Sequence, residues 1–312
     1  MTKILIFKKV LTKLYSKYSM YILPIIKFIG TLISVIGINH FIGGGMLNNL
    51  IVTIAVPLVC CVMPANIIIL VLSLVMVLDI YSIALEMALV TVLFYVIMYI
   101  FYFRFSSRYG YVLMLTPIFF FLRIPYIMPL IVGLALTPSA IIAMAFGIFV
   151  FYMMKYAGLE NISTVNTVKA SGMDKASSFI RNMISNKEVI VMVCAFVVAA
   201  LLVYGIKKMS ISYSATLGIT VGGIVELIFI IAGKLAFDIE GFAPIWMVCV
   251  LSVISVGIMY ILQYFIVAVD YSRTEYAQFE DDDYYYYVKA VPKINITASN
   301  IRVKHINVKR LK

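Results

Sequence analysis

The residues that could carry chemistry are ionisable side chains inside long apolar runs. Glu226 is the deepest, near the middle of its run, three residues after Gly223 and four after Gly222. Asp79 lies inside another apolar run. An ionisable group at the centre of a membrane helix costs about 2.5–3.5 kcal/mol, so it usually has a partner or a function. A carboxylate pair such as Asp79 and Glu226 could relay protons or hold a cation. The alternative is a structural salt bridge or hydrogen bond between packed helices.

A second candidate feature is the stretch LTPIFFFLRIPYIMPLIVGL, in which Pro117, Arg123 and Pro125 interrupt an apolar region. The interruption divides 111–137 into two pieces of twelve residues. As a helix each is about 18 Å long, too short to cross a ~30 Å hydrocarbon core. In transporters, such broken segments commonly supply the substrate or ion site. Arg123 is the natural cationic partner of Glu226 if the segment folds into the bundle. Otherwise Pro125 only turns the chain and Arg123 reaches lipid phosphates.

Enzyme chemistry is not indicated. The sequence has no HExxH, GxSxG or GxxxxGK[ST] motif of a zinc protease, a serine hydrolase or a phosphate-binding loop. Its two histidines, His40 and His305, lie near the end of a run and in the tail, and its four cysteines lie in apolar runs without metal-ligand spacing. We therefore expect no enzyme activity, no catalytic residue, no metal site and no cofactor.

The elements that must position these residues are membrane helices. Hydrophobic residues make up 64% of the 312 residues and charged residues 12%, a composition that predicts an all-α polytopic membrane protein. The net charge of +11 does not indicate nucleic-acid binding, because the basic residues lie in the termini and loops, where they orient a membrane protein. Eight full-length spans are predicted, at 21–41, 48–63, 66–85, 87–103, 138–156, 189–206, 211–235 and 245–269.

Charge bias predicts that both termini are cytoplasmic. Five lysines precede the first span and eight Lys or Arg follow Asp270, and the positive-inside tendency favours the cytoplasm for both groups. An even number of crossings satisfies this, and it makes 111–137 a re-entrant hairpin rather than one kinked span. The exception is the loop 157–188, whose basic residues would then lie outside.

The chain is thus divided into an interfacial amphipathic helix at 1–20, a helical bundle at 21–269 and a cytoplasmic tail at 270–312. The lysines of the first region are expected to contact anionic lipid headgroups. Apolar residues recur at helical spacing from Met173 to Met183, which predicts a short amphipathic helix. Such a helix could lie on the membrane or, if it is cytoplasmic, dock on a separate ATPase subunit.

The tail begins acidic and aromatic and then turns basic. In the stretches KINIT and IRVKHINV, apolar and polar residues alternate as in half-buried strands. Such strands could join the sheet edge of a cytoplasmic partner protein; the alternative is a polybasic tail drawn to anionic lipid. The candidate partner-binding residues are Tyr284, Tyr285, Tyr286, Tyr287, Ile294, Ile296 and Val303.

Several stretches carry a family resemblance. With FEDDDYYYYVKAVPKI, GGGMLNNL and FYFRFSSRYGYVLMLTPIFFFLRIPY, most of the chain resembles a group of uncharacterised multi-pass membrane proteins of low-GC Gram-positive bacteria. Members of that group are sometimes labelled ABC-transporter permeases. The resemblance implies a protein of the bacterial plasma membrane and hints at a permease.

Two classes of function follow from the sequence. The first is a transport subunit, powered by a separate ATPase, with a path at the 111–137 hairpin. The residues of that path are Glu226, Arg123, Asp79, Pro117, Pro125, Gly222 and Gly223. The second is a membrane scaffold of an envelope or secretion assembly, in which the tail recruits a cytoplasmic partner.

The predicted topology can be checked by cysteine labelling in intact cells. In a background without the four native cysteines, we expect an impermeant maleimide to label the Ser163→Cys and Ser185→Cys variants but not Ser299→Cys, because only the loop lies outside. The reverse pattern would mean nine crossings and a kinked span at 111–137.

Overall fold

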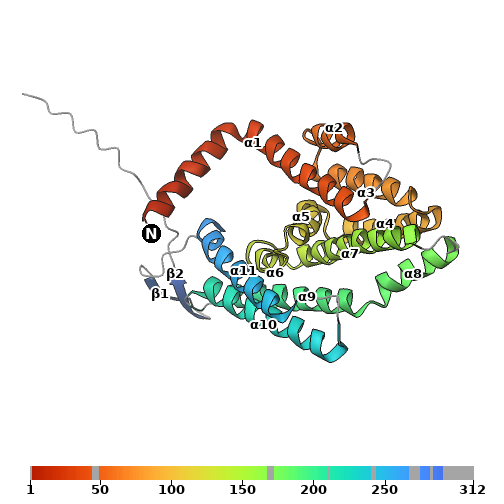
Figure 1. Ribbon diagram of the computed structural model, residues 1–312. Coiled ribbons are helices and arrows are strands. Elements are labelled where there is room, and N and C mark those ends of the chain that lie inside the picture. Colours follow the sequence, from red (N-terminus) through yellow and green to blue (C-terminus); the bar gives the residue numbers. More distant parts are fainter. Residues whose placement is uncertain are drawn as a thin grey trace, which may run out of the picture. The chain divides into compact units, whose positions relative to one another are not determined.

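The apolar runs of this sequence form α-helices, in which backbone N–H and C=O groups bond within the segment and need no water. The computed structural model describes residues 2–43, 49–166, 172–209, 211, 213–239, 244–266, 275–281 and 284–290 (Figure 1). By its internal contacts the chain divides into two units, one of residues 18–267 and one of residues 1–17 with 268–312.

The helices follow the chain in order. They are α1 (Thr2–Ile42), α2 (Leu50–Cys60), α3 (Ala65–Tyr81), α4 (Leu85–Phe105), the 3-10 helix η1 (Ser107–Tyr109), α5 (Gly110–Phe121), α6 (Ile127–Ala135), α7 (Ser139–Asn166), α8 (Gly172–Ile184), α9 (Lys187–Lys208), α10 (Ser214–Phe237) and α11 (Ile245–Ile266). Within α1 the backbone of Tyr18 is not helical, with φ −118° and ψ 21°. The predicted first region, 1–20, is therefore helical from Thr2 and continues across this kink into the first long apolar segment.

Among the described residues, six segments are long and apolar enough to cross a membrane, whereas the sequence predicts eight. They are Lys17–Ile42, Leu85–Phe105, Ser139–Leu159, Ala176–Lys208, Ser214–Phe237 and Ile245–Gln263. The expected spans at 48–63 and 66–85 form shorter helices, because turns take up residues that hydropathy alone assigns to spans. Helix α2 ends before Pro64 with 11 residues, about 16 Å. Helix α3 ends at Tyr81 after 17 residues, about 25 Å, where the Ser82 hydroxyl donates to the Asp79 carbonyl.

The loss of these two spans does not alter the predicted side of any later loop. The two shortened segments are consecutive. Removing both lowers the number of crossings before residue 85 by two, so every later loop stays on the same predicted side of the membrane. The expected positions of the 157–188 loop and of the tail relative to the membrane therefore stay predictions.

The predicted break between 111 and 137 is confirmed. Helix α5 ends at Phe121, and α6 begins at Ile127 with nine residues. The N–H of Arg123 donates to the Phe120 carbonyl (3.0 Å) and the N–H of Ile124 to the Phe119 carbonyl (2.9 Å). This pair of bonds is the Schellman motif, in which the first residue after the helix C-cap has a left-handed backbone and is normally glycine. Arg123 occupies that position with φ 61°, and Pro125 follows.

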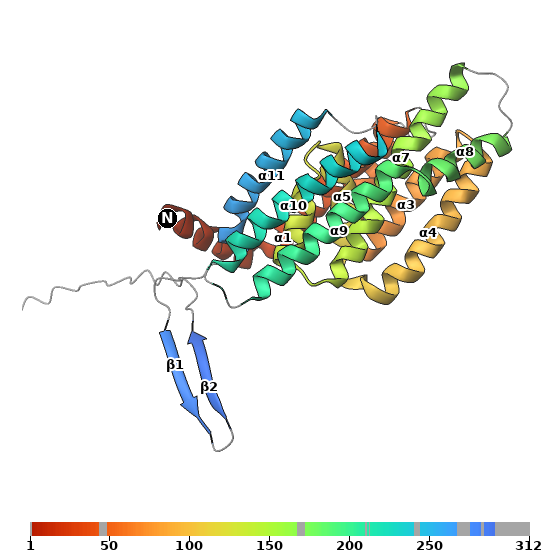
Figure 2. The same ribbon diagram turned by 90° about the horizontal axis from the view of Figure 1, so that it is seen from below.

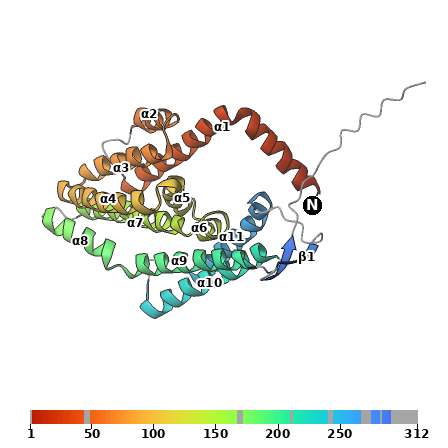
Figure 3. The same cartoon turned by 180° about the vertical axis from the view of Figure 1, so that it is seen from behind.

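Helix α6 lies among other helices. In Figure 1 and, from behind, Figure 3, α5 and α6 lie inside the bundle, with α1 on one side and α9 and α10 on the other. A Cβ atom at Gly133 of α6 would lie 2.6 Å from the Ala200 carbonyl oxygen of α9, so glycine permits this close approach. Figure 2 shows α9 and α10 running alongside each other. A small core cluster joins α6, α9, α10 and α11 through Ile127, Leu130, Leu134, Val203, Ala215, Ile219 and Met259.

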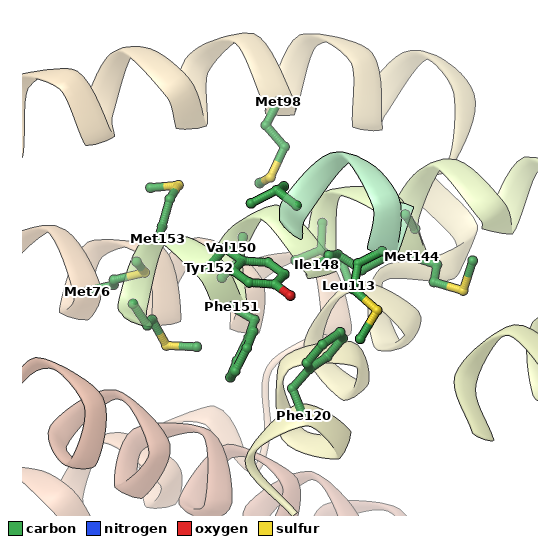
Figure 4. Close-up of a cluster of buried hydrophobic side chains, with 14 of the residues drawn as sticks. Met76, Met98, Leu113, Phe120, Met144, Ile148, Val150, Phe151, Tyr152 and Met153 are labelled. Atoms are coloured by element: carbon green, nitrogen blue, oxygen red, sulfur yellow. The ribbon is translucent and has the colours of Figure 1, made fainter. Parts of the chain in front are cut away.

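The main core lies between α3, α4, α5, α7, α8 and α9. Figure 4 shows its centre, where Phe120, Phe151 and Tyr152 lie among methionines. The Phe120 and Phe151 rings are stacked with centroids 4.5 Å apart. The amphipathic helix predicted from Met173 to Met183 is confirmed as α8, and it packs on α4 and α7 with Phe179 and Met183 in this core.

The tail contains a β-hairpin that hydropathy patterns did not indicate. Strand β1 (Glu275–Glu280) pairs antiparallel with β2 (Tyr285–Ala290), with Phe279 opposite Tyr286. Between the strands, the N–H of Asp281 donates to the Tyr284 carbonyl (2.9 Å). The predicted strands at KINIT and IRVKHINV, with Ile294, Ile296 and Val303, lie outside the described residues.

The left-handed residue at the break provides a test of its geometry. We expect Arg123→Gly to raise the free energy of unfolding by about 1 kcal/mol, because glycine adopts φ near +60° without steric cost. The measurement is the melting temperature in detergent, which should rise. The matched control is Leu122→Gly at a position of negative φ (−74°), where glycine should lower the free energy of unfolding by about 0.5–1 kcal/mol. A loss of stability in Arg123→Gly as large as in the control would contradict the left-handed cap.

Candidate functional site

Like Asp79 of α3, Glu226 is fully buried in the bundle. Its side chain is 1% exposed and projects from α10. Neither carboxylate oxygen has a hydrogen-bond partner within the part of the chain that the structure describes. Burying a polar group without a compensating hydrogen bond costs several kcal/mol in hydrocarbon. Glu226 is therefore costly to the fold, and the helices around it supply no donor that offsets this cost.

The break between α5 and α6 leads the chain to the side of the bundle that holds α10. Tyr126, the residue before α6, is buried, and α6 packs on α9, α10 and α11. The Tyr126 ring packs edge-on against Phe196 of α9, with centroids 6.4 Å apart. The turn predicted at Pro125 thus places a buried tyrosine that the sequence reasoning did not select in this part of the bundle.

Gly222 and Gly223 serve helix packing at this level of α10. A Cβ atom at Gly222 would overlap Val203 Cγ2 of α9, and one at Gly223 would lie 2.5 Å from Val256 Cγ2 of α11. From the sequence, the missing side chains of these glycines could let either another helix or a ligand approach. In the structure, α9 packs against Gly222 and α11 against Gly223. The surroundings of Glu226 are therefore tightly packed.

The other candidates of the predicted path lie elsewhere. Arg123 is exposed in the α5–α6 break and forms no ion pair with Glu226. Asp79 is 1% exposed on α3, which packs on α4 and α5, whereas α10 packs on α9, α11 and α6. The two carboxylates thus belong to different parts of the bundle. Pro117 is inside α5 and lines a cavity, and Pro125 is buried in the break.

A second polar cluster was missed by the sequence reasoning. Lys155 of α7 donates to both carboxylate oxygens of Glu188 on α9, at 2.8 and 3.1 Å, and the Tyr152 hydroxyl donates to the same carboxylate at 3.1 Å. Asn186 caps α9 by accepting from the Glu188 N–H (2.8 Å) and donates to the Tyr156 hydroxyl (2.6 Å). Lys155 within an apolar run was the available signal, because a buried cation needs a partner.

Of the three buried acids, Asp79, Glu188 and Glu226, the last two differ in kind. Glu188 has a cation, a hydroxyl and a helix N-terminus as partners, an arrangement that stabilises a carboxylate. Glu226 has no hydrogen-bond partner for either oxygen among the described residues. The first arrangement joins α7 to α9, and the second leaves two oxygens for another species.

Comparison with known proteins returns no match: no protein-family model, no curated protein and no solved structure matches this chain. The arrangement of buried polar groups is therefore the observation from which a function can be inferred.

The difference between the two acids can be measured as stability. We expect Glu226→Leu to raise the free energy of unfolding by about 1–3 kcal/mol, because it removes a buried polar group that lacks a hydrogen bond. Glu188→Leu should lower it by about 2 kcal/mol, because it leaves Lys155 without its charged hydrogen bonds. Thermal unfolding of both variants in the same detergent is the measurement. If Glu226→Leu is as unstable as Glu188→Leu, then Glu226 has a structural role.

Proposed function

We propose that this protein is a membrane transport subunit in which Glu226 binds a proton or a small monovalent cation. The observation that carries the proposal is the burial of both carboxylate oxygens without a donor from the described residues. Ionisable residues inside membrane helices are rare, and they mark ion pathways and proton relays. A species that binds to Glu226 would supply the interaction that the helices do not.

Packing around Glu226 favours a small ligand. Val203 and Val256 occupy the space beside the two glycines of α10, so the helices leave no room there for a large substrate. A single carboxylate can hold a proton, and it carries the charge that a small monovalent cation requires.

The broken segment is the second element of the proposed path. We infer that α5 and α6 enter and leave the membrane on one side, so that the turn at 122–126 leads into α6, which packs on α10. Non-helical backbone at membrane depth is tolerated where it is buried in protein or lines a water-filled cavity. The resemblance noted above supports a permease of the bacterial plasma membrane, and the charge bias supports cytoplasmic termini. Because the sequence has no phosphate-binding loop motif, a separate ATPase is the proposed energy source.

A scaffold role is favoured by a different observation, the hairpin of the tail. Tyr284, Tyr285, Tyr286 and Tyr287 are all exposed, and the rings of Tyr284 and Tyr286 lie 6.2 Å apart. A two-stranded hairpin alone is marginally stable in water, so a partner protein that adds a strand to it would stabilise it. In this second function the helical bundle is an anchor and the tail recruits the partner.

Flux in proteoliposomes tests the transport proposal. We expect the purified full chain to conduct protons or Na⁺ down an imposed gradient, read with an entrapped pH- or Na⁺-sensitive dye. Glu226→Gln should reduce the flux about tenfold or more, the effect of ~1.4 kcal/mol lost from a binding step. The matched control is Glu86→Gln in the first turn of α4, which should leave the flux unchanged.

Deletion of 275–312 separates the two functions. Transport through Glu226 predicts unchanged flux in the shortened chain, whereas a scaffold predicts that only this deletion abolishes the cellular phenotype. Equal flux in the wild type and Glu226→Gln, for both ions, would overturn the transport proposal.

A further inference from the structure

Helices α10 and α11 pack against each other in a single antiparallel register. Gln263 of α11 donates to the Thr216 hydroxyl of α10 at 2.8 Å, and a Cβ atom at Gly223 would lie 2.5 Å from Val256 Cγ2. Thr216 and Gly223 are seven residues apart in α10, and Val256 and Gln263 are seven residues apart in α11. The two contacts therefore agree on which residues of the two helices lie at the same level.

This register places two serines of α11 at the level of Glu226. Glu226 follows Gly223 by three residues, so it is level with the residue three before Val256. Ser252 and Ser255 lie about 1.5 and 3 Å along the helix axis from that level, since a helix rises about 1.5 Å per residue. Both serines are buried, with exposed fractions of 4% and 0%.

The two serines lie on the face of α11 that packs into the bundle. The buried residues of α11 recur at helical spacing and are Val248, Ser252, Ser255 and Met259. Met259 belongs to the small core cluster that includes Ile127 and Leu130 of α6. The serines therefore share a helix face with a residue that packs against α6.

Glu226 projects from α10 toward the same region. At about 100° per residue, it lies on the helical wheel between Gly222, which faces Val203 of α9, and Gly223, which faces Val256 of α11. Helix α6 packs on α9, α10 and α11 and covers the remaining side. The Glu226 carboxylate and the two serines are therefore brought to one buried position among these helices.

Three oxygens at this position have no hydrogen-bond partner among the described residues. They are Oε1 and Oε2 of Glu226 and Oγ of Ser255. Because Glu226 and Ser255 do not bond to each other, a proton on the carboxyl group would leave the serine hydroxyl unbonded. Two oxygens that bind one metal cation stand farther apart than two oxygens that share a hydrogen bond. This arrangement therefore favours a cation over a proton.

The charge of the surroundings favours a monovalent cation. Helices α6 and α11 contain no charged residue, and neither does α9 between 189 and 206. The next charged residue of α10, Lys234, is about 12 Å farther along the helix. One positive charge neutralises Glu226, whereas a divalent ion would leave an uncompensated charge among apolar side chains.

We propose that Glu226, Ser252 and Ser255 form a binding site for a dehydrated monovalent cation such as Na⁺. The inference rests on the proposed function of Glu226 and narrows its ligand to a metal cation. The carboxylate supplies the charge, and the serine hydroxyls supply neutral oxygens with lone pairs to donate to the cation. Hard cations prefer such oxygen ligands.

Stabilisation by Na⁺ tests the proposal. The purified full chain in detergent is unfolded thermally in NaCl and in choline chloride of the same ionic strength. An ion that binds only the folded state raises the melting temperature. We expect Na⁺ to raise the melting temperature of the wild type with a saturable concentration dependence, and to have no such effect on Glu226→Gln.

Removal of a serine hydroxyl distinguishes a ligand from a structural group. Ser255→Ala should raise the Na⁺ concentration for half-maximal stabilisation about tenfold, equivalent to ~1.4 kcal/mol of lost binding. In choline chloride the same variant should be at least as stable as the wild type, because it removes a buried hydroxyl that lacks a hydrogen bond. Ser252→Ala should weaken the Na⁺ response in the same direction.

The matched control is Ser73→Ala. Ser73 is a buried serine of α3, and its hydroxyl donates to the Leu70 carbonyl at 2.8 Å. This substitution should leave the Na⁺ concentration for half-maximal stabilisation unchanged.

Two results would overturn the cation site, and both differ from a failure of the transport proposal. If Na⁺ does not stabilise the wild type while proton flux still depends on Glu226, the ligand is a proton. If Ser255→Ala and Ser252→Ala both keep the wild-type Na⁺ response, the serines are not ligands. Flux that is independent of Glu226, together with intact Na⁺ stabilisation, would instead reject transport and leave the cation site in place.

Discussion

Two backbone hydrogen bonds end helix α5 inside the bundle, from the Arg123 and Ile124 N–H groups to the Phe120 and Phe119 carbonyls. In hydrocarbon every backbone polar group must be bonded within the protein. A helix that ends inside such a bundle therefore needs donors for its last carbonyls. The Schellman bonds supply them, and Pro125 prevents the helix from continuing. Because of this cap the chain turns, and α6 packs on α9, α10 and α11.

Glu188 and Glu226 are both buried carboxylates, but only Glu188 has hydrogen-bond partners among the described residues. At the start of α9, Glu188 is bonded by Lys155, by Tyr152 and by the helix that Asn186 caps. This network joins α7 to α9 through Lys155 and Glu188, which are 33 residues apart in sequence. In α10, Glu226 carries two buried oxygens with no such partners among the described residues. Since burial without bonds costs free energy, the contrast between the two acids, rather than burial alone, distinguishes Glu226 as the candidate for function.

Glycines decide how closely the helices approach. Gly133, Gly222 and Gly223 let α6, α9, α10 and α11 meet backbone to side chain, as small residues do in membrane helix packing. On the other side of the bundle, Cβ atoms at Gly30 of α1 and Gly158 of α7 would meet Met114 of α5 and the Phe41 carbonyl of α1. Glycine thus permits close contacts between helices in both regions.

Much of the architecture follows from the sequence by itself. Apolar runs of about 20 residues determine membrane helices because the hydrocarbon thickness sets their length, and RIP determines a break because proline cannot continue a helix. Hydropathy cannot show where turns remove residues, so it predicted full spans where α2 and α3 are short. It also missed the hairpin of the tail, whose two strands are recognised only once they pair. Only the tertiary structure decided which polar groups meet: it joined Lys155 to Glu188 and separated Asp79 and Arg123 from Glu226. The physical reason is that these contacts depend on helix packing across long sequence separations, whereas composition and periodicity report only on neighbours along the chain.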